Sequence, residues 1–430
     1  MKFKHLNLLQ LLAWLTTLVN NATTSPSSYF YSPNNYVEMR SLTEEDQSIP
    51  FHNFTTLPEA LVGVEKYALS FNSSLNYPAL LFAFSIKKKT IFKKAWGMAD
   101  IENGLQANVN NTFRMLSLSK SFTAAVIGQL VDQGRLKYED SVYQYVDSAH
   151  FSRKSFGGKA VDITIGQLLS HTAGIHATNG RLDFFTTIDP PDNVTEQIKR
   201  FKDQPLHRAP GTAFEYANNG FQVLGAVIES VTGKSYQSVM REFFAAHKLH
   251  GMKVQESSTM LHNIPRYYSG AEPKTLLRPM DARAKPTFPT TPFDEMIYLN
   301  GWWSAAGLVA TLDDLLHYGH LLIDAYKGRP GAILKQETIK KMWSKHVSVG
   351  RHGAFAENSG YGYAWFVSTP PNQVSRTVIF HSGGIMGLTS QLTIFPEEEM
   401  VGVTFINKGV ILEGEQMVLY AAANLYHLIK

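Results

Sequence analysis

The sequence contains no cysteine, and this absence excludes thiol nucleophiles, disulfide bonds and zinc sites built from thiolates. It also lacks a His-Glu-x-x-His motif, and its 15 histidines are scattered along the chain, so no metal-dependent mechanism is indicated. A Gly-x-Ser-x-Gly pentapeptide is missing too, which leaves the α/β-hydrolase class without support. We therefore expect a protein that works without a metal or any other cofactor.

An excess of charge of one sign is also missing. The 40 basic residues nearly balance the 36 acidic ones, which gives a formal net charge of +4, and no long block of like charges occurs. The lysine-rich stretch at 87–94 alternates like a strand and is explained by a solvated strand face, so a nucleic-acid partner is not implied. What the chain has is apolar content, 44% hydrophobic and 12% aromatic, which is enough to bury a large core.

The N-terminus has the plan of a secretory signal peptide. Lys2 and Lys4 precede a mostly apolar run of about 14 residues from Leu6 to Val19, whereas a membrane-spanning helix needs roughly 20. We expect residues 1–22 to be cleaved and the protein to be secreted, with an uncleaved membrane anchor as the alternative. No arginine occurs before Arg40, which argues against an arginine-rich mitochondrial transit peptide. Sequons that suit a secreted glycoprotein begin at Asn21, Asn53, Asn72, Asn110 and Asn193.

After this leader, the pattern indicates a flexible lead-in over residues 23–56 and one folded domain over residues 57–430. The domain starts with a helix and two strand-like runs, continues through long helical patterns, and returns to short strands and a closing helix. This order predicts an α+β fold with one antiparallel sheet, built from N- and C-terminal strands and flanked by helices. A mostly helical lobe is inserted between these strands, and we expect the active site between sheet and lobe.

The first candidate for catalytic chemistry is the segment FRMLSLSK at 113–120, which leads into an amphipathic helix. Ser117 stands at the start of this helix, and Lys120 lies on the same face, so its amine can reach the Ser117 hydroxyl. This spacing predicts a serine nucleophile with a lysine as its base partner. A second Ser-x-x-Lys match, Ser85 to Lys88, falls in a strand-like run, where residues three apart point to opposite faces.

The second candidate is the segment PGTAFEYAN at 210–218, a turn followed by a helix. Tyr216 and Asn218 alternate toward one side of it. A tyrosine oxygen beside a lysine amine can relay a proton, and an asparagine amide can both orient the lysine and bind a substrate amide. The other interpretation is a buried tyrosine with a capping asparagine, and a Tyr-x-Asn tripeptide also occurs at 298–300.

The third candidate is the segment IFHSGG at 379–384, between two strand-like runs. Its glycines, Gly383 and Gly384, allow a substrate to approach the backbone of a strand edge. The amides of Gly384 and Ser117 are expected to form an oxyanion hole, and His381 is expected to face the bound carbonyl or carboxylate. A His-x-Gly tripeptide occurs by chance at 317–319, so this motif proves little by itself.

Taken in order, Ser117 to Lys120, Tyr216 to Asn218 and His381 to Gly383 resemble the motifs of the serine beta-lactamase-like family. This family includes class C beta-lactamases, D-alanyl-D-alanine carboxypeptidases, D-aminopeptidases, related esterases and animal beta-lactamase-like proteins. The resemblance runs from about residue 57 to the end and includes landmark segments at 97–100, 168–174 and 306–308. It implies a beta-lactamase/transpeptidase-like fold and a hydrolase that forms an acyl-enzyme on an ester, amide or peptide-like substrate.

The third motif departs from the family pattern, because His381 stands where bacterial beta-lactamases of this kind carry a lysine. With an ordinary pKa of about 6.5, a histidine is largely neutral at pH 7 and is a weaker anchor for a carboxylate. The pattern is therefore more similar to the carboxypeptidase, esterase and animal branches. A binding or scaffold protein with weak or no activity is the alternative, and the sequence identifies neither the acyl donor nor the oligomeric state. His171, at the end of a helical run, is interpreted as a structural residue.

Overall fold

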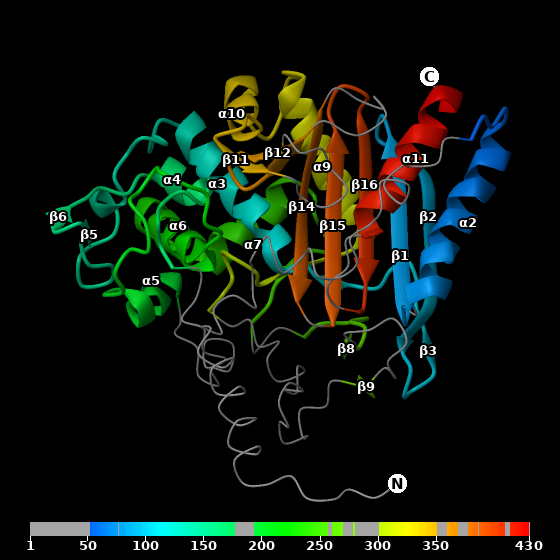
Figure 1. The fold of residues 1–430 in the computed structure, drawn as a ribbon, viewed down its shortest axis with the longest axis horizontal. Coiled ribbons are helices and arrows are strands. Elements are labelled where there is room, and N and C mark those ends of the chain that lie inside the picture. The colour runs from blue at the N-terminus through cyan, green and yellow to red at the C-terminus, as the bar shows by residue number, and fades with distance from the viewer. Residues whose placement is uncertain are drawn as a thin grey trace, which may run out of the picture.

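The computed structural model describes residues 52–75, 77–176, 193–256, 260–269, 278–279, 301–350, 359–368, 377–385, 387–408 and 413–429. Within these ranges, a large sheet forms one part of the molecule and a cluster of helices lies beside it (Figure 1). The predicted leader and most of the predicted lead-in fall outside the described residues. None of the helices in the described ranges is long and apolar enough to cross a membrane.

The sheet is antiparallel and joins strands from opposite ends of the chain. β1 (Ala79–Ile86) pairs with β2 (Lys89–Asp100) on one side and with β16 (Met400–Ile406) on the other. The predicted sheet of N- and C-terminal strands is therefore confirmed. Within the described ranges, the nine strands of the sheet are, in spatial order, β11 (Val347–Gly350), β12 (Ser359–Tyr361), β13 (Phe366–Ser368), β14 (Val378–Ile385), β15 (Leu388–Phe395), β16, β1, β2 and β3 (Leu105–Gln106).

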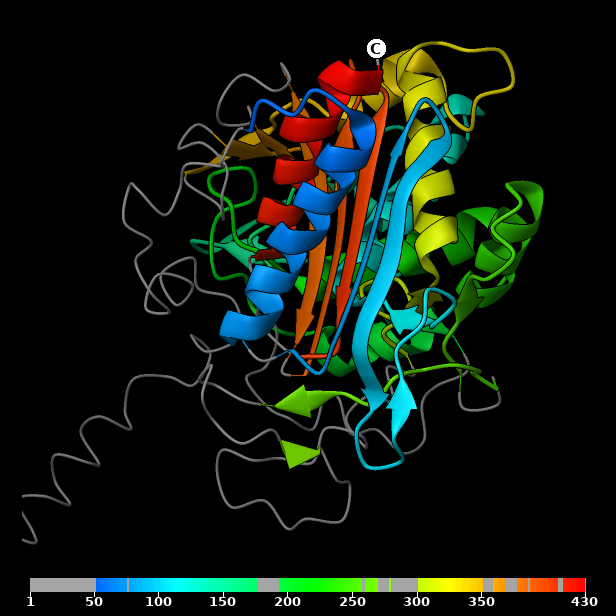
Figure 2. The ribbon, with the colours of Figure 1, turned by 90° about the vertical axis from the view of Figure 1, so that its right-hand side faces the viewer.

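Helices cover both faces of the sheet, which explains why all eight residues of β1 are buried. The side chains at 80, 82 and 84 are buried with residues of α2 (Leu57–Leu75) and α11 (Glu413–Ile429). Those at 79, 81 and 83 point the other way, into the larger core that the sheet shares with the helical lobe. Figure 2 shows α2 and α11 side by side across one face, with α9 (Leu312–Tyr326) behind the other.

The inserted lobe is mostly helical, as the sequence predicted. Its central helices, α3 (Ser119–Asp132) and α6 (Asn218–Thr232), pack against each other in the larger core. The other helices are η3 (Leu116–Leu118), η4 (Val142–Gln144), α4 (Ile165–Leu169), α5 (Val194–Gln197), η6 (Ile198–Phe201), α7 (Tyr236–Ala246) and α10 (Gln336–Met342). Short strands are β4 (Phe113–Arg114), β5 (Ser155–Phe156), β6 (Lys159–Ala160), β7 (Lys253–Val254), β8 (Tyr268–Ser269), β9 (Arg278–Pro279) and β10 (Leu308–Ala310).

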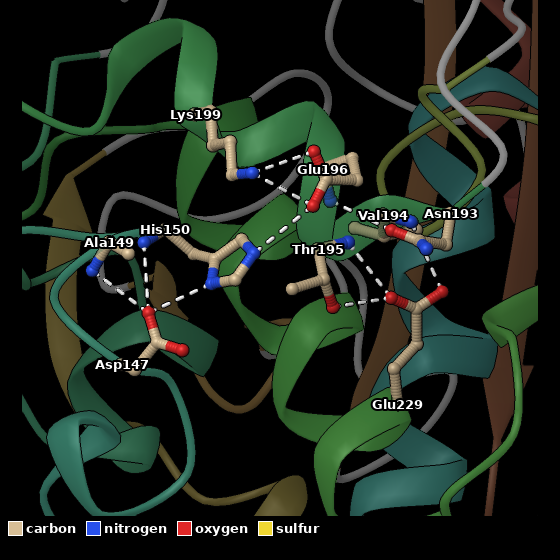
Figure 3. Close-up of polar contacts among 9 residues, drawn as sticks. All are labelled: Asp147, Ala149, His150, Asn193, Val194, Thr195, Glu196, Lys199 and Glu229. Carbon is tan, nitrogen blue, oxygen red and sulfur yellow. Dashed lines mark hydrogen bonds and ion pairs between the residues drawn. The ribbon is translucent and has the colours of Figure 1, made fainter.

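One buried carboxylate, that of Glu229 in the last turn of α6, ties three helices of the lobe together. Its oxygens accept hydrogen bonds from the amides of Val194 and Thr195 at 3.1 and 2.8 Å, and from the Thr195 hydroxyl at 2.6 Å (Figure 3). It also accepts from the Tyr236 amide at 2.9 Å. These amides open α5 and α7, and amides in a first helical turn have no partner within their own helix. Glu229 therefore caps two helices at once.

We expect Glu229→Ala to lower the free energy of unfolding by about 3 kcal/mol, because several buried donors lose their acceptor. Glu242→Ala is the matched control, since Glu242 pairs with Lys234 at 2.7 Å on the exposed side of α7. Such an exposed ion pair contributes less than about 1 kcal/mol. Urea unfolding of both variants measures the difference, and equal losses in the two variants would contradict the capping role of Glu229.

Candidate active site

Ser117, the predicted nucleophile, lies half-buried in the single turn η3, which leads directly into α3. The residue before it, Leu116, has a φ of 49°, in the left-handed region that residues other than glycine rarely adopt. Such backbone conformations cost energy and cluster at functional sites. The helix start that the sequence placed at Ser117 is therefore accompanied by a strained backbone step immediately before the serine.

The amine of Lys120 is enclosed by three oxygen atoms. Its Nζ lies 3.0 Å from Ser117 Oγ, 2.7 Å from Asn218 Oδ1 and 2.9 Å from the carbonyl oxygen of Ala305. The side chain has no exposed surface. These partners belong to η3, to the first residue of α6 and to the segment before β10, so the amine joins parts of the chain up to 185 residues apart.

Burial lowers the pKa of Lys120 well below its ordinary value, because the charged ammonium loses its hydration. A neutral amine has two N–H donors and one lone pair. The oxygens of Asn218 and Ala305 can act as acceptors for the two donors. The lone pair is then left for the Ser117 hydroxyl, which has a proton to give. This geometry suits transfer of the serine proton to the lysine.

The backbone that follows Ala305 holds the nucleophile segment in place. The Met115 amide donates to the Leu308 carbonyl at 2.9 Å, and the Leu308 amide donates to Ser119 Oγ at 3.2 Å. β10 also pairs with β4, the short strand that precedes the nucleophile in the chain. The sequence marked 306–308 as a landmark but did not predict the contact of the Ala305 carbonyl with Lys120, because a backbone atom leaves no signal in residue type.

Tyr216 is 6% exposed, and its ring centre lies 4.9 Å from Lys120 Nζ. It stands in an extended segment immediately before α6, which begins at Asn218. Both residues of the second motif therefore meet Lys120, one through its ring and the other through its amide oxygen. An aromatic face stabilises a nearby cation, so the Tyr216 ring favours the ammonium that forms when Lys120 accepts a proton.

His381 makes its hydrogen bonds inside the protein. Its side chain is fully buried, its Nδ1 donates to the Ser382 carbonyl at 2.7 Å, and its Nε2 accepts from the Tyr361 hydroxyl at 3.0 Å. That His381 faces a bound carbonyl or carboxylate stays a prediction, and in this structure both ring nitrogens are engaged inside the protein. One of these partners, Tyr361, lies on β12, which is separated from β14 by β13 in the sheet, so the sequence motif does not reveal its position.

The two glycines of the third motif meet different surroundings. A Cβ on Gly383 would lie 1.9 Å from the Met115 carbonyl oxygen, so β14 can approach the nucleophile segment this closely because the residue is glycine. Gly384 is exposed, and a Cβ there would meet nothing within 4 Å. β13 pairs with β14 only at 378–380, so Gly384 lies beyond the stretch that pairs with β13, while on the other side it pairs with Thr389 of β15. These positions are compatible with the predicted substrate-binding edge.

The structure thus brings Ser117, Lys120 and Asn218 together by hydrogen bonds and places the Tyr216 ring beside them. Across the described ranges, no group of three or more His, Asp or Glu side chains is arranged to hold a metal ion. A serine–lysine pair between an antiparallel sheet and a helical lobe defines the class of beta-lactamase-like serine hydrolases.

The chain belongs to the beta-lactamase family, whose model, described as Beta-lactamase, matches residues 64–426. The human serine beta-lactamase-like protein LACTB, mitochondrial, is 23% identical over 398 residues, which cover 75% of this chain and 69% of that protein. Protein flp from Staphylococcus aureus strain MRSA252 is 26% identical over 333 residues, which cover 74% of this chain and 57% of flp. The family that the three motifs indicated is therefore confirmed.

Solved structures share the fold. The octameric penicillin-binding protein homologue from Pyrococcus abyssi matches with a TM-score of 0.69 at 23% identity, over 85% of this chain and 77% of that one. EstCE1, a hydrolase with promiscuous acyltransferase activity, matches with a TM-score of 0.70 at 19% identity, over 85% of this chain and 99% of that one. A class C beta-lactamase matches with a TM-score of 0.63 at 17% identity, over 87% and 98%. The predicted beta-lactamase/transpeptidase-like fold is confirmed.

Gly383→Ala and Gly384→Ala form a matched pair that tests the contact behind the nucleophile. We expect Gly383→Ala to lower the free energy of unfolding by about 2 kcal/mol or more, because its Cβ would collide with the Met115 carbonyl. Gly384→Ala should change it by less than about 0.5 kcal/mol, because its Cβ enters open space. Denaturant unfolding compares the variants, and a Gly383→Ala protein as stable as the unsubstituted chain would overturn this view of the contact.

Proposed function

We propose that this protein is a serine hydrolase that forms an acyl-enzyme at Ser117 on an ester, amide or peptide-like substrate. The observation that supports this most is the buried Lys120 amine, which has two acceptor oxygens and the Ser117 hydroxyl as its neighbours. A serine hydroxyl is a weak nucleophile until a base takes its proton. Lys120 is the base in this proposal.

The reaction begins when Ser117 Oγ bonds to the substrate carbonyl carbon while its proton passes to Lys120 Nζ. The backbone amides of Ser117 and Gly384 stabilise the negative charge that develops on the carbonyl oxygen. As the bond to the leaving group breaks, the leaving group receives the proton from Lys120 through the Tyr216 hydroxyl. Water then attacks the Ser117 ester with the same base, which releases the acid and restores the serine hydroxyl.

The surroundings of His381 bear on the substrate class. To contact an acidic substrate, its ring must first release the Tyr361 hydroxyl or the Ser382 carbonyl. The family's lysine anchor is also absent, so we assign neutral esters and amides as the favoured substrates, with Asn218 and Gly383 on the binding edge. The description of EstCE1 as a hydrolase with acyltransferase activity and that of a Streptomyces D-stereospecific amidohydrolase, TM-score 0.64, support acyl transfer of this kind.

The alternative function is that of a binding or scaffold protein without catalytic activity. Such a protein does not require a neutral lysine that is held against a serine hydroxyl. Burying Lys120 disfavours its charge, and Leu116 keeps a strained backbone conformation beside it. Both features make the site costly for a scaffold and useful for catalysis, so they support the enzymatic proposal.

We also propose that residues 1–22 direct secretion and are removed, and that residues 57–430 fold as the hydrolase domain after the lead-in at 23–56. The lysine-flanked apolar run supports the first point, and a family match over residues 64–426 supports the second. The LACTB relatives carry "mitochondrial" in their names. N-terminal sequencing and localisation of the mature protein test the proposal: secretion predicts a start just after residue 22 in secreted material, and a mitochondrial product would overturn it.

Glycosylation is part of the secretion proposal. Asn53 and Asn110 are exposed, so their sequons are accessible to glycan attachment. The Asn193 side chain instead accepts a hydrogen bond from the Glu196 amide at 2.8 Å and caps α5. We therefore assign the first two asparagines as the better glycosylation sites among the described residues.

A fluorophosphonate probe should label the protein at Ser117, because this hydroxyl has a base within hydrogen-bond distance. Mass spectrometry of the labelled peptide identifies the residue, and Ser117→Ala should abolish labelling. Ser85→Ala is the matched control, since Ser85 belongs to the second Ser-x-x-Lys match but is buried in β1 and bonded to His320 at 2.8 Å. Labelling that persists in Ser117→Ala, or that disappears in Ser85→Ala, would rule out the assignment.

The acylation rate should rise with pH, because the neutral form of Lys120 accepts the proton. The midpoint of this rise should lie well below the ordinary lysine value, since burial lowers the pKa of Lys120 in the folded protein. Lys120→Ala should slow acylation by a factor on the order of 100 or more and remove this rise. Rates with the same probe across the pH range provide the measurement, and a rise centred at a pKa of about 10.4 would contradict a buried lysine base.

A further inference from the structure

His171 follows α4 with a φ of 55°, in the left-handed region, and is 2% exposed. The sequence predicts a structural residue at the end of this helix. In the structure its side chain bonds another segment, the one that carries Tyr216. Its role therefore differs from that of an ordinary helix end.

Two hydrogen bonds join His171 to the backbone on either side of Tyr216. The Glu215 amide donates to the His171 carbonyl at 2.8 Å. The Ala217 amide donates to His171 Nδ1 at 3.1 Å. His171 thus holds the amides of Glu215 and Ala217. This fixes the direction of the Tyr216 side chain, which lies between them in the sequence, and that of Asn218, which follows Ala217.

The imidazole ring also fills the space between the second and third motifs. Its centre lies 4.1 Å from the Tyr216 ring centre, with an angle of 36° between the planes, and 5.0 Å from the ring centre of Tyr361. Tyr361 in turn bonds His381 at 3.0 Å. His171 therefore lies between the aromatic residue that contacts Lys120 and the one that contacts His381.

Burial lowers the pKa of His171 well below its ordinary value, so the ring is neutral. Because Nδ1 accepts from Ala217, the ring proton is on Nε2. Nε2 is buried and has no hydrogen-bond partner in the described part of the chain. A phenylalanine would fill the same space without this unsatisfied group, so the ring is better suited to supplying an acceptor at Nδ1 than to packing.

We propose that His171 is a positioning residue, which acts through the Ala217 amide to hold Tyr216 and Asn218 against Lys120. The proposal rests on the proposed function, since these are the groups assigned to the proton transfer. His171 itself touches neither the substrate nor the Ser117 hydroxyl in this assignment. Its loss should slow the chemical step and leave substrate binding largely unchanged, because the base is misplaced and the binding edge is not.

Two substitutions separate the acceptor from the ring. In His171→Asn, the side-chain Oδ1 takes the place of Nδ1 as acceptor, and asparagine adopts the left-handed conformation readily. In His171→Phe, the ring is kept and the acceptor is lost. With the fluorophosphonate probe, His171→Asn should acylate within about fivefold of the unsubstituted protein, and His171→Phe should be slower by a factor on the order of 100 at the same probe affinity. Thermal unfolding of both variants checks that each is folded.

A packing role predicts the reverse order of activity, because it depends on the ring. The proposal is overturned if His171→Phe acylates at the original rate, or if folded His171→Asn is as slow as His171→Phe.

A crystal structure of His171→Phe gives a readout that does not depend on activity: the 2.7 Å distance between Lys120 Nζ and Asn218 Oδ1 should lengthen. If the unsubstituted protein is not labelled at Ser117 but this distance lengthens, the proposed function fails and the positioning role holds. An unchanged distance rejects the positioning role.

Discussion

The buried amine of Lys120 is the constraint on which the rest of the site depends. A side chain with no exposed surface carries a full charge only at a large cost, and an uncharged amine still needs acceptors for two N–H groups. Asn218 and Ala305 supply them. The amine keeps these acceptors only while α3, α6 and the segment before β10 keep their relative positions, so the proposed chemistry depends on the packing of the lobe.

The same packing holds the strained backbone before the nucleophile. Met115 is bound from two directions, because its amide donates to Leu308 and its carbonyl accepts from Ser390 Oγ at 2.7 Å. Ser390 stands on β15 opposite Gly383 of β14, and the missing side chain of Gly383 leaves room for this second contact. Leu116, with its positive φ, lies between the doubly bonded Met115 and Ser117. Such a strained conformation is kept only where the surrounding structure holds it in place. The sheet and the lobe thus set the position of the serine together.

The sequence predicted those parts of the molecule that depend on local periodicity and residue type. Helix spacing placed Lys120 on the face of Ser117, and strand alternation placed Tyr216 and Asn218 on the side that meets Lys120. It could not reveal contacts made by backbone atoms or by residues distant in the chain. The Ala305 carbonyl has no signature in a side chain, and the burial of His381 depends on Tyr361 from another strand. The sequence placed His171 at a helix end, but its acceptor role follows from the segment folded against it.

The pairing of β1 with β16 has a consequence for the synthesis of the chain. Leu80 lies opposite Ile406, so the edge of β1 that pairs with β16 has no partner until β16, one of the last segments of the chain, has been made. Until then, the hairpin of β1 and β2 presents an open edge and apolar side chains on both faces. Contacts this distant in sequence form slowly, and incomplete sheets of this kind are prone to aggregate. During translation, the N-terminal hairpin therefore keeps an apolar, unpaired edge until the C-terminal strands have been made.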